Sequence, residues 1–316
     1  MTLVIVKTLR TLGWLVARLA KYLRDYGLKG VVLFFIKAFA ILLSRPPSRP
    51  SLVRTRTGLL LMLLPGDRGI CAELLRWRVH EPFLTTELAK VVSKGMVVLD
   101  VGSNVGYYAV HEAALVGPEG MVVAVEPQPH AYKALLASLK ANGFRNVVAV
   151  RRAVSRTRGS LKFAISSFSN WSRVNASRTD GDVVEEIDVE ASSIDDLISE
   201  LGLQRLDLVR LDVEGYEEEV IKGMGEVMDR FRPVICMELH VSYLGLEKSI
   251  ALLARLMKKG YRILFAAPRL LDYYPLSSSP YAVYPKGDAR QQLLEVFEKP
   301  YMHEVIHLCL FPDGQL

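Results

Sequence analysis

The chain has 316 residues, half of them apolar, which supports a large folded domain and excludes a disordered chain. The net charge is +6, but the first 58 residues carry +10, with Asp25 as their single acid, so the remainder carries −4. A basic, apolar segment precedes a mildly acidic domain, and this asymmetry indicates a binding partner for the segment.

The three cysteines, Cys71, Cys236 and Cys309, are far apart and form neither a CxxC pair nor a zinc-binding spacing. We therefore expect buried, apolar thiols in a reducing compartment rather than a disulfide framework.

Residues 1–44 are predicted to form a helical arm. Basic side chains from Lys7 to Arg24 fall on one side of a helix and leucines fall on the other, and Gly27 is a suitable end for it. The segment Val31–Leu43 is apolar except for Lys37, but it is shorter than the ~20 residues that cross a bilayer. It also begins too far along the chain for the apolar part of a secretory signal.

We interpret this arm as an anchor that lies on an anionic membrane surface, which places the protein in the cytoplasm, peripheral to the inner membrane face. Packing on the main domain or on a second copy of the chain is the alternative, and the oligomeric state stays open. Nucleic-acid binding is disfavoured because the charges alternate with aliphatic rather than stacking aromatic side chains.

The Pro-rich stretch Ser44–Ser51 predicts a linker over residues 45–56, followed by one domain over residues 57–316. This domain should begin with a strand within Thr57–Asp67, which closes in a Pro-Gly turn, and a helix within His80–Gly95, which ends at glycine.

Apolar strands then alternate with helices, which predicts an α/β fold with a mostly parallel sheet covered by helices on both faces. The expected strands are 97–101, 121–125, 147–151, 207–211, 233–238 and 261–265, with a late strand within His303–Phe311. The expected helices lie near 105–116, 129–141, 194–202, 216–224 and 246–258. The sequence Ser192–Asp195 resembles a capping box for the third helix.

Polar side chains follow several of these strands at the point where each strand ends. They are Asp100, Glu126, Asp212, Glu214, Glu238 and His240. The carboxyl ends of parallel strands meet at one edge of the sheet, where ligands bind in such folds. We therefore expect these groups to share a site, although Glu214 has the alternative role of capping the helix that it precedes.

The turn after the first of these strands contains Gly102 and Gly106 within the sequence VVLDVGSNVGYY (Val97–Tyr108). Gly102 allows the chain to turn and Gly106 allows close approach of the next helix. The spacing differs from the dinucleotide-binding pattern, and the carboxylate of Asp100 would repel a pyrophosphate. An ammonium group, as in the amino-acid part of S-adenosylmethionine, fits better, and Glu126 can accept hydrogen bonds from two ribose hydroxyls. A helix cap is the alternative role of Asp100.

With these motifs the chain resembles the FkbM family of S-adenosylmethionine-dependent methyltransferases, over roughly Glu81–Tyr243. The resemblance rests on Val97–Tyr108, Val122–Pro129, Val147–Ser155, Leu206–Met224 and Val234–His240. It implies a Rossmann-like class I methyltransferase fold. The cofactor-binding residues that we predict are Asp100, Gly102, Asn104, Gly106, Glu126, Pro127 and Ala153.

The resemblance also implies methyl transfer, most often to a hydroxyl oxygen. Such an acceptor needs a base and an aligned methyl donor, and our catalytic candidates are His240, Asp212 and Glu238. The intrinsic pKa of histidine is the most suitable for a base, and a hydrogen-bonded structural role is the alternative for His240. The two acids are also possible ligands for a divalent cation, which the sequence does not require. Ser103 and Arg210 depart mildly from the family pattern, which more often has alanine and lysine there. If that lysine contacts substrate, the acceptor differs in this chain.

The expected acceptor is a small molecule, a glycan or a lipid-linked metabolite, bound under the polar segment Ser166–Asp182, where Trp171 could stack on a sugar ring or only anchor the loop. A nucleotide-dependent oxidoreductase and a non-catalytic membrane scaffold are the alternatives. Nucleic acid is not expected, because the domain is acidic and lacks the Asp/Asn-Pro-Pro-Tyr/Phe motif of amino-group transfer.

Overall fold

The computed structural model describes residues 46–166, 168–174, 183–269 and 281–314, together with scattered helical positions between residues 19 and 35. Most of the arm predicted over residues 1–44 lies outside these residues. Among the residues that the structure describes, no helix combines the length and the apolar character that a membrane span requires.

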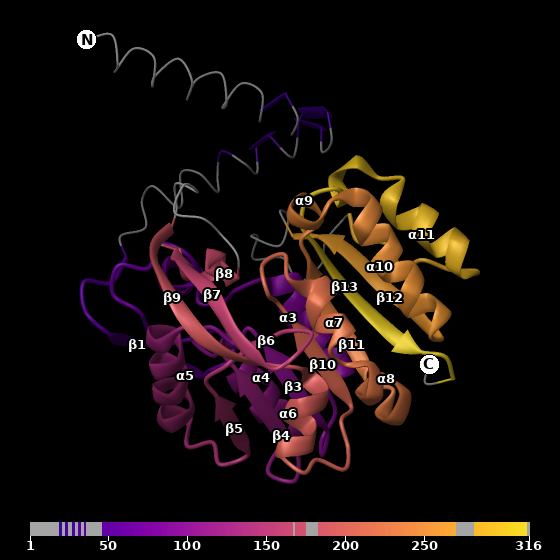
Figure 1. Cartoon of the computed structure of the whole chain (residues 1–316). Coiled ribbons are helices and arrows are strands. Elements are labelled where there is room, and N and C mark those ends of the chain that lie inside the picture. The colour runs from indigo at the N-terminus through magenta and orange to yellow at the C-terminus, as the bar shows by residue number, and fades with distance from the viewer. Residues whose placement is uncertain are drawn as a thin grey trace.

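Within the described residues, seven strands form a central sheet in the order β12-β13-β11-β10-β3-β4-β5 (Figure 1). These strands are β3 (Val97–Val101), β4 (Met121–Val125), β5 (Val147–Val150), β10 (Leu208–Leu211), β11 (Val234–Leu239), β12 (Tyr261–Pro268) and β13 (Ile306–Pro312). Strand β13 runs antiparallel to both of its neighbours, whereas the other pairs are parallel. The predicted strands are confirmed, two of them with the bounds expected.

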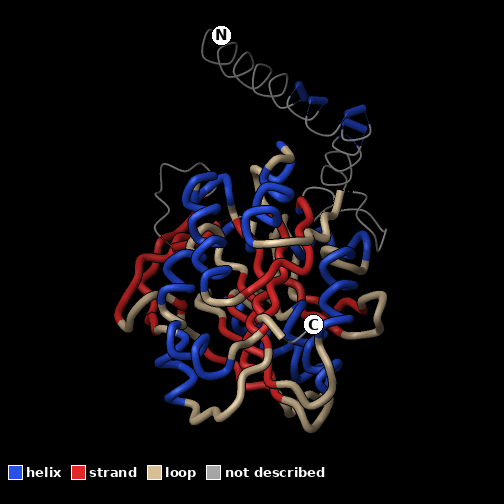
Figure 2. The backbone as a smooth tube through the Cα atoms, turned by 90° about the vertical axis from the view of Figure 1, so that its right-hand side faces the viewer, coloured by secondary structure: helices blue, strands red, loops and turns tan. Residues whose placement is uncertain are grey.

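Helices cover both faces of this sheet, so that the strands lie inside a layered molecule (Figure 2). One face packs against α2 (Ile70–Trp77), α3 (Pro82–Val91), α4 (Tyr107–Val116) and α5 (Pro129–Asn142). The other packs against α6 (Ile194–Glu200), α7 (Glu217–Lys222), α8 (Gly225–Phe231), α10 (Leu246–Lys258) and α11 (Ala289–Phe297). Neighbouring strand residues such as Val98 and Leu99 belong to opposite cores, as the alternation of side chains along a strand requires.

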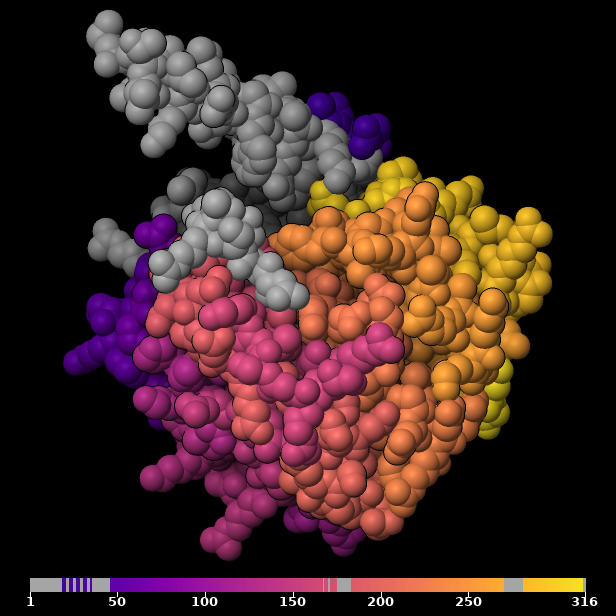
Figure 3. Space-filling view, viewed as in Figure 1, coloured from indigo at the N-terminus to yellow at the C-terminus, as the bar shows by residue number. Residues whose placement is uncertain are grey.

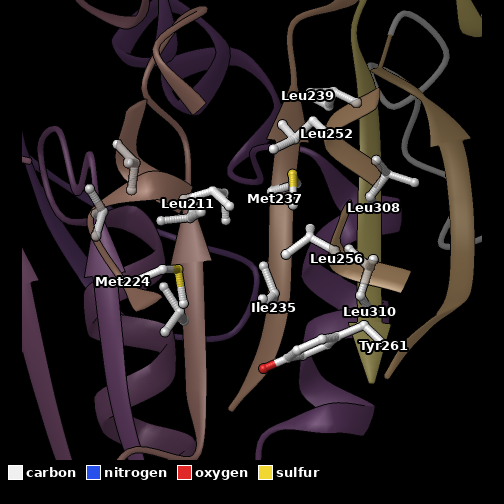
Figure 4. Packing of buried hydrophobic residues seen from close by; sticks show 14 of the residues in the cluster. Leu211, Met224, Ile235, Met237, Leu239, Leu252, Leu256, Tyr261, Leu308 and Leu310 are labelled. Carbon is white, nitrogen blue, oxygen red and sulfur yellow. The ribbon is translucent and has the colours of Figure 1, made fainter. Parts of the chain in front are cut away.

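The packing of α10 shows how the sequence produces this second core (Figure 4). Leu252 and Leu256 are one helical turn apart, so both face the sheet, where Ile235, Met237 and Leu239 alternate along β11. All five side chains are buried. Burial of each such side chain stabilises the fold by about 1.5–3 kcal/mol.

A second sheet of four described strands, in the order β6-β9-β7-β8, follows the first half of the central sheet along the chain. Its strands are β6 (Ala153–Val154), β7 (Gly159–Ser166), β8 (Arg173–Val174) and β9 (Val183–Ser192), and the short helix η1 (Ser169–Trp171) precedes β8. On the face shown in Figure 3, this part of the chain, in pink, lies beside the orange residues of α7–α10. The sequence analysis did not anticipate this sheet.

Three local predictions need correction. Strand β1 (Ser51–Arg54) lies inside the range 45–56 that we expected to be a linker, and it pairs with β2 (Leu60–Leu63). The capping box of α6 is one residue later than predicted: Ser193 accepts from the amide of Asp196, whose side chain bonds back. The helix expected near 216–224 ends at Lys222, and α8 begins separately at Gly225.

The cysteines also differ from the expectation. Cys236 of β11 and Cys309 of β13 are partners in the antiparallel register, with their Cα atoms 4.1 Å apart, and they form a disulfide. Cys71 is a buried thiol, as predicted. The pair could not be predicted from the sequence, because its members are 73 residues apart and lie side by side only in the sheet, where β13 pairs with β11.

The turn between β3 and α4 is held against the segment that follows β10. Gly102 has a φ of +83°, and a Cβ atom there would lie 1.9 Å from the carbonyl oxygen of Asp212. At Gly106, with a φ of +92°, a Cβ atom would lie 2.7 Å from Leu135 of α5. The predicted reasons for both glycines, a turn and a close approach, are therefore confirmed.

We expect Gly102→Ala to lower the free energy of unfolding by about 3 kcal/mol or more, because a left-handed backbone and a backbone clash act together. Gly143→Ala is the matched control: its φ is +70°, but no atom lies within 4 Å of the added Cβ, so only the cost of the left-handed backbone, about 1–2 kcal/mol, should remain. Urea unfolding of both variants measures the difference. Equal losses would show that the contact with Asp212 is unimportant.

Candidate active site

A pocket lies between the carboxyl edge of the central sheet and the second sheet. Its space, including the open mouth, is about 600 Å³. Its floor consists of residues from the ends of β3, β4 and β10, and its roof consists of residues from β7, η1 and β8. The lining residues are Val101, Gly102, Asn104, Val125, Glu126, Pro127, Arg152, Ala153, Val154, Phe163, Ser169, Ser172, Val174, Asp212, Val213, Glu214 and Tyr216.

The floor contains an acceptor atom that has no partner within the described structure. Asn104 has a φ of +50°, and its side-chain oxygen is buried without a hydrogen bond from any described residue. A buried acceptor of this kind is costly unless a donor reaches it. Together with the approach that Gly102 allows, this oxygen fits a ligand with an N–H or O–H group.

Glu126 forms the end of the floor beside β4. One carboxylate oxygen accepts a hydrogen bond from the backbone N–H of Asn104 and the other from the backbone N–H of Gln128, both at 2.8 Å. Burial raises the pKa of Glu126 to about 7; the two amides oppose this shift, and the carboxylates of Asp100 and Asp212 add to it. Each oxygen keeps a second lone pair for a ligand hydroxyl.

Arg210 of β10 holds two of the acids that the sequence placed at this edge. Its guanidinium donates to Asp100 at 2.9 Å and to Asp212 at 3.0 Å, and it lies over the ring of Tyr108 with a distance of 3.8 Å to the ring centre. Asp100 and Arg210 are partners in the strand register and both are buried. Arg210, which stands where the family pattern more often has lysine, therefore stabilises the floor of the pocket from the side away from the ligand space.

His240, at the end of β11, lies between carboxylates. Its Nδ1 is 2.8 Å from Glu217 and its Nε2 is 3.1 Å from Glu214 and 3.5 Å from Glu238. Although burial lowers the pKa of the ring, Glu214 and Glu217 outweigh this effect and hold the pKa of His240 well above its ordinary value. Burial raises the pKa of Glu238 as well.

The donor atoms of Asp212, Glu238 and His240 lie within 4.8 Å of one another, which allows a test of the predicted cation site. Each group already faces a positive partner or is positive itself. Asp212 accepts from Arg210, Glu238 is 2.7 Å from Nε of Arg269, and His240 has carboxylates at both nitrogens. Both carboxylate oxygens of Glu238 and Nε2 of His240 are nevertheless buried without a hydrogen-bond partner among the described residues, so the cation site stays a prediction.

The predicted site residues are brought to one end of the molecule, but not all of them line the pocket. Those that do are Gly102, Asn104, Glu126, Pro127, Ala153 and Asp212. The others lie behind the pocket wall: Asp100, Gly106, Glu238 and His240. The contact of Asp100 with a ligand ammonium therefore stays a prediction. Of the segment Ser166–Asp182, the described part forms the roof, while residues 167 and 175–182 are outside the described residues.

Phe163 of the roof escaped the sequence analysis, whereas Ser169, Ser172 and Val174 belong to the segment that was predicted to cover the acceptor but were not singled out. The alternation of Leu161, Phe163 and Ile165 within β7 was the signal that could have revealed a strand. Glu217 was also missed, because it is one of three consecutive acids at the start of α7.

The strand order, the antiparallel β13 and the glycine turn at the carboxyl edge define a Rossmann-like class I methyltransferase fold, as predicted. The model of the methyltransferase FkbM domain matches residues 100–263, just over half of the chain. The chain therefore belongs to the FkbM methyltransferase family.

Two curated relatives match this part of the chain. Hexuronic acid methyltransferase AglP of Haloferax volcanii is 30% identical over 169 residues, which are 52% of this chain and 66% of that protein. Methyltransferase sdnD of Sordaria araneosa is 27% identical over 169 residues, which are 44% of this chain and 64% of that protein. The chain thus spans just under two thirds of the length of these relatives.

Similar solved structures include the methyltransferase FkbM of Methylobacillus flagellatus KT, with 10% identity, a TM-score of 0.45 and coverage of 90% of this chain and 60% of that chain. Fibrillarin of Aeropyrum pernix, solved with bound S-adenosyl-L-methionine, has 13% identity, a TM-score of 0.42 and coverage of 86% of each chain.

The pKa of Glu126 leads to a prediction for cofactor binding. If the carboxylate form binds the ribose hydroxyls, the Kd of S-adenosylmethionine should fall roughly tenfold from about pH 6 to about pH 8, as Glu126 loses its proton. Isothermal titration calorimetry of the full chain measures this, and Glu126→Gln should bind more weakly with little pH dependence. NAD should give no binding heat; tight NAD binding would contradict the assignment of the pocket.

Proposed function

We propose that this protein transfers a methyl group from S-adenosylmethionine to a hydroxyl oxygen of a sugar. The observation that carries the proposal is the floor of the pocket, where the turn at Gly102, the buried oxygen of Asn104 and the carboxylate of Glu126 lie beside the acids Asp212 and Glu214. When bound there, S-adenosylmethionine supplies an electrophilic methyl group on a sulfonium. An ammonium or hydroxyl of the cofactor would satisfy the oxygen of Asn104.

The chain's own residues account for the other requirements of O-methylation. Val101 and Val125 exclude water from the floor, and the acids after β10 lie where the proton of an acceptor hydroxyl must go. The predicted catalytic groups Asp212, Glu238 and His240 form a connected cluster there.

The mouth of the pocket supports a sugar as the acceptor. Trp171 and Tyr243 are large aromatic side chains that are 40% and 52% exposed, and the guanidinium of Arg173 lies 5.3 Å from the centre of the Tyr243 ring. Ser169 and Ser172, which are close to Trp171 in the sequence, line the pocket. Trp171 stacks on Phe168 and Tyr243 stacks on His240, and the parts of these rings that stay exposed are suited to contact with a sugar ring.

Arg173 favours an acidic sugar in particular. Arginine binds carboxylates with two parallel hydrogen bonds, and the relative from Haloferax volcanii is named as a hexuronic acid methyltransferase. Arg173 stands between Ser172 and Val174, which line the pocket, and a uronic acid whose carboxylate binds Arg173 is the acceptor that we propose.

The test is methyl transfer from radiolabelled S-adenosylmethionine to methyl glucuronide and methyl glucoside. Arg173→Ala should raise KM for the glucuronide roughly tenfold or more and leave the glucoside almost unaffected, because only the first loses a charged hydrogen bond. Arg145→Ala, an exposed arginine at the amino end of β5, is the matched control. Transfer to neither sugar would remove the proposed function, and equal effects on both sugars would remove the role of Arg173.

The proposal extends to where the enzyme acts. The arm has an excess of basic side chains, and at its described helical positions Leu28, Val32 and Phe35 are 71%, 50% and 50% exposed. Spacings of four and three residues place these side chains on one face of a helix. An apolar face flanked by cations is typical of helices that lie on anionic membranes, and it supports a lipid-linked acceptor.

We expect the full chain to co-sediment with vesicles that contain phosphatidylglycerol and much less with vesicles of phosphatidylcholine alone, since the arm combines apolar and cationic groups. The triple variant Leu28→Glu, Val32→Glu, Phe35→Glu should lose this binding. The control replaces three comparably exposed residues of the domain by glutamate: Leu52, Leu136 and Leu294. Unchanged sedimentation of the arm variant would exclude membrane attachment through this face.

A further inference from the structure

Two glutamates hold His240 from opposite sides. Glu217 is fully buried at the start of α7, and its Oε1 lies 2.8 Å from Nδ1 of His240. The same oxygen accepts from the amide of Gly215 at 2.9 Å, so Glu217 fixes both the imidazole and the turn that carries Glu214. The ring of Tyr243 stacks on the imidazole with centres 5.8 Å apart and limits its rotation.

Of Glu217, His240 and Glu214, only Glu214 lines the pocket. It has a φ of +50°, a conformation that is costly for a residue with a side chain. Its carboxylate is 3.1 Å from Nε2 of His240, and the residue lines the pocket wall. The protein thus maintains an unfavourable backbone at a position where an acid faces the ligand space.

We propose that Glu214 accepts the proton of the acceptor hydroxyl, and that His240, held by Glu217, is the positioning residue that orients it. This inference rests on the proposed function and assigns the base that the sequence had placed at His240. His240 is buried and does not line the pocket, whereas Glu214 does, so an acceptor hydroxyl in the pocket can reach Glu214 but not the imidazole.

The other acids near the pocket are less suitable. Asp212 lines the pocket, but its carboxylate already accepts a hydrogen bond from Arg210. Glu238 lies behind the wall, with Arg269 at 2.7 Å. Glu214 both lines the pocket and lies 3.1 Å from Nε2 of His240, a combination that neither Asp212 nor Glu238 shows among the described contacts.

The step is balanced as follows. The acceptor oxygen forms a bond to the methyl carbon while the bond from that carbon to sulfur breaks, and the electron pair of the broken bond stays on sulfur, which becomes a neutral thioether. The hydroxyl proton moves to a carboxylate oxygen of Glu214, and from there it leaves to solvent when the methylated product departs. His240 stays a cation throughout and balances the charge of the carboxylate.

The first test needs no acceptor. In the full chain labelled with ¹³C at histidine Cε1, the His240 resonance, identified by its absence in His240→Asn, should show no titration between about pH 5.5 and pH 8.5. Glu217→Gln should bring a titration midpoint into this range, and Glu218→Gln, in which the neighbouring acid faces Lys222 instead, should not. A midpoint near that of ordinary histidine in the unaltered chain would overturn the inference.

The second test uses methyl transfer to methyl glucuronide. Glu214→Gln should lower kcat by about 100-fold or more, with the calorimetric Kd of S-adenosylmethionine within about twofold of the unaltered chain. Retention of more than about a tenth of kcat would overturn the assignment of the base. No transfer by the unaltered chain would instead overturn the proposed function, and with it the role of Glu214, while the titration of His240 would still decide whether the ring is held as a cation.

Discussion

The pair formed by Arg210 and Asp100 is the interaction on which the pocket depends. It joins the two central strands, β10 and β3, at residues 110 positions apart in the chain, and both side chains are buried. Breaking a buried pair by removing one partner costs about 3–5 kcal/mol, because the other charge is left without compensation. The same guanidinium donates to Asp212 and lies over Tyr108, so one side chain aligns the glycine turn, the acid segment and helix α4.

From this pair a chain of buried polar contacts continues behind the pocket. The hydroxyl of Tyr108 donates to Glu81, and Arg269 reaches both Glu81 and Glu238. Not every atom of this network has a partner: Oδ2 of Asp100, Nε of Arg210 and both carboxylate oxygens of Glu238 are buried without a hydrogen bond to a described residue. The charges behind the pocket are thus only partly compensated, while the pocket wall itself presents few charged groups, namely Glu126, Arg152, Asp212 and Glu214.

The central sheet was predictable because each of its strands is a short, mainly apolar run, and local patterning alone reveals this; a glycine or an acid directly follows β3, β4 and β10. Which charged side chains pair with one another behind the pocket could not be predicted in the same way. The partner of Asp100 is Arg210, which only the register of β3 with β10 brings beside it. One partner of His240 is Glu214, which only the turn after β10 brings beside it. Likewise Cys236 and Cys309 pair through β13, whose position in the sheet the sequence does not state. The sheet of β6–β9 was overlooked because β7 is followed by a polar segment, and its short alternation of apolar and polar residues was assigned to a loop.

The division of the pocket between two sheets has a consequence for redesign. The floor takes its shape from backbone turns and buried charges, so most substitutions there disturb the fold as well as the ligand. The roof is different: Phe163 and Val174 pair across β7 and β8 and contribute shape without charge. Exchanging them for smaller or larger apolar side chains changes the volume above the floor and leaves the bonds of Glu126 and Arg210 intact. Under the proposed function, these roof positions are where acceptor range can be altered without disturbing the floor of the pocket.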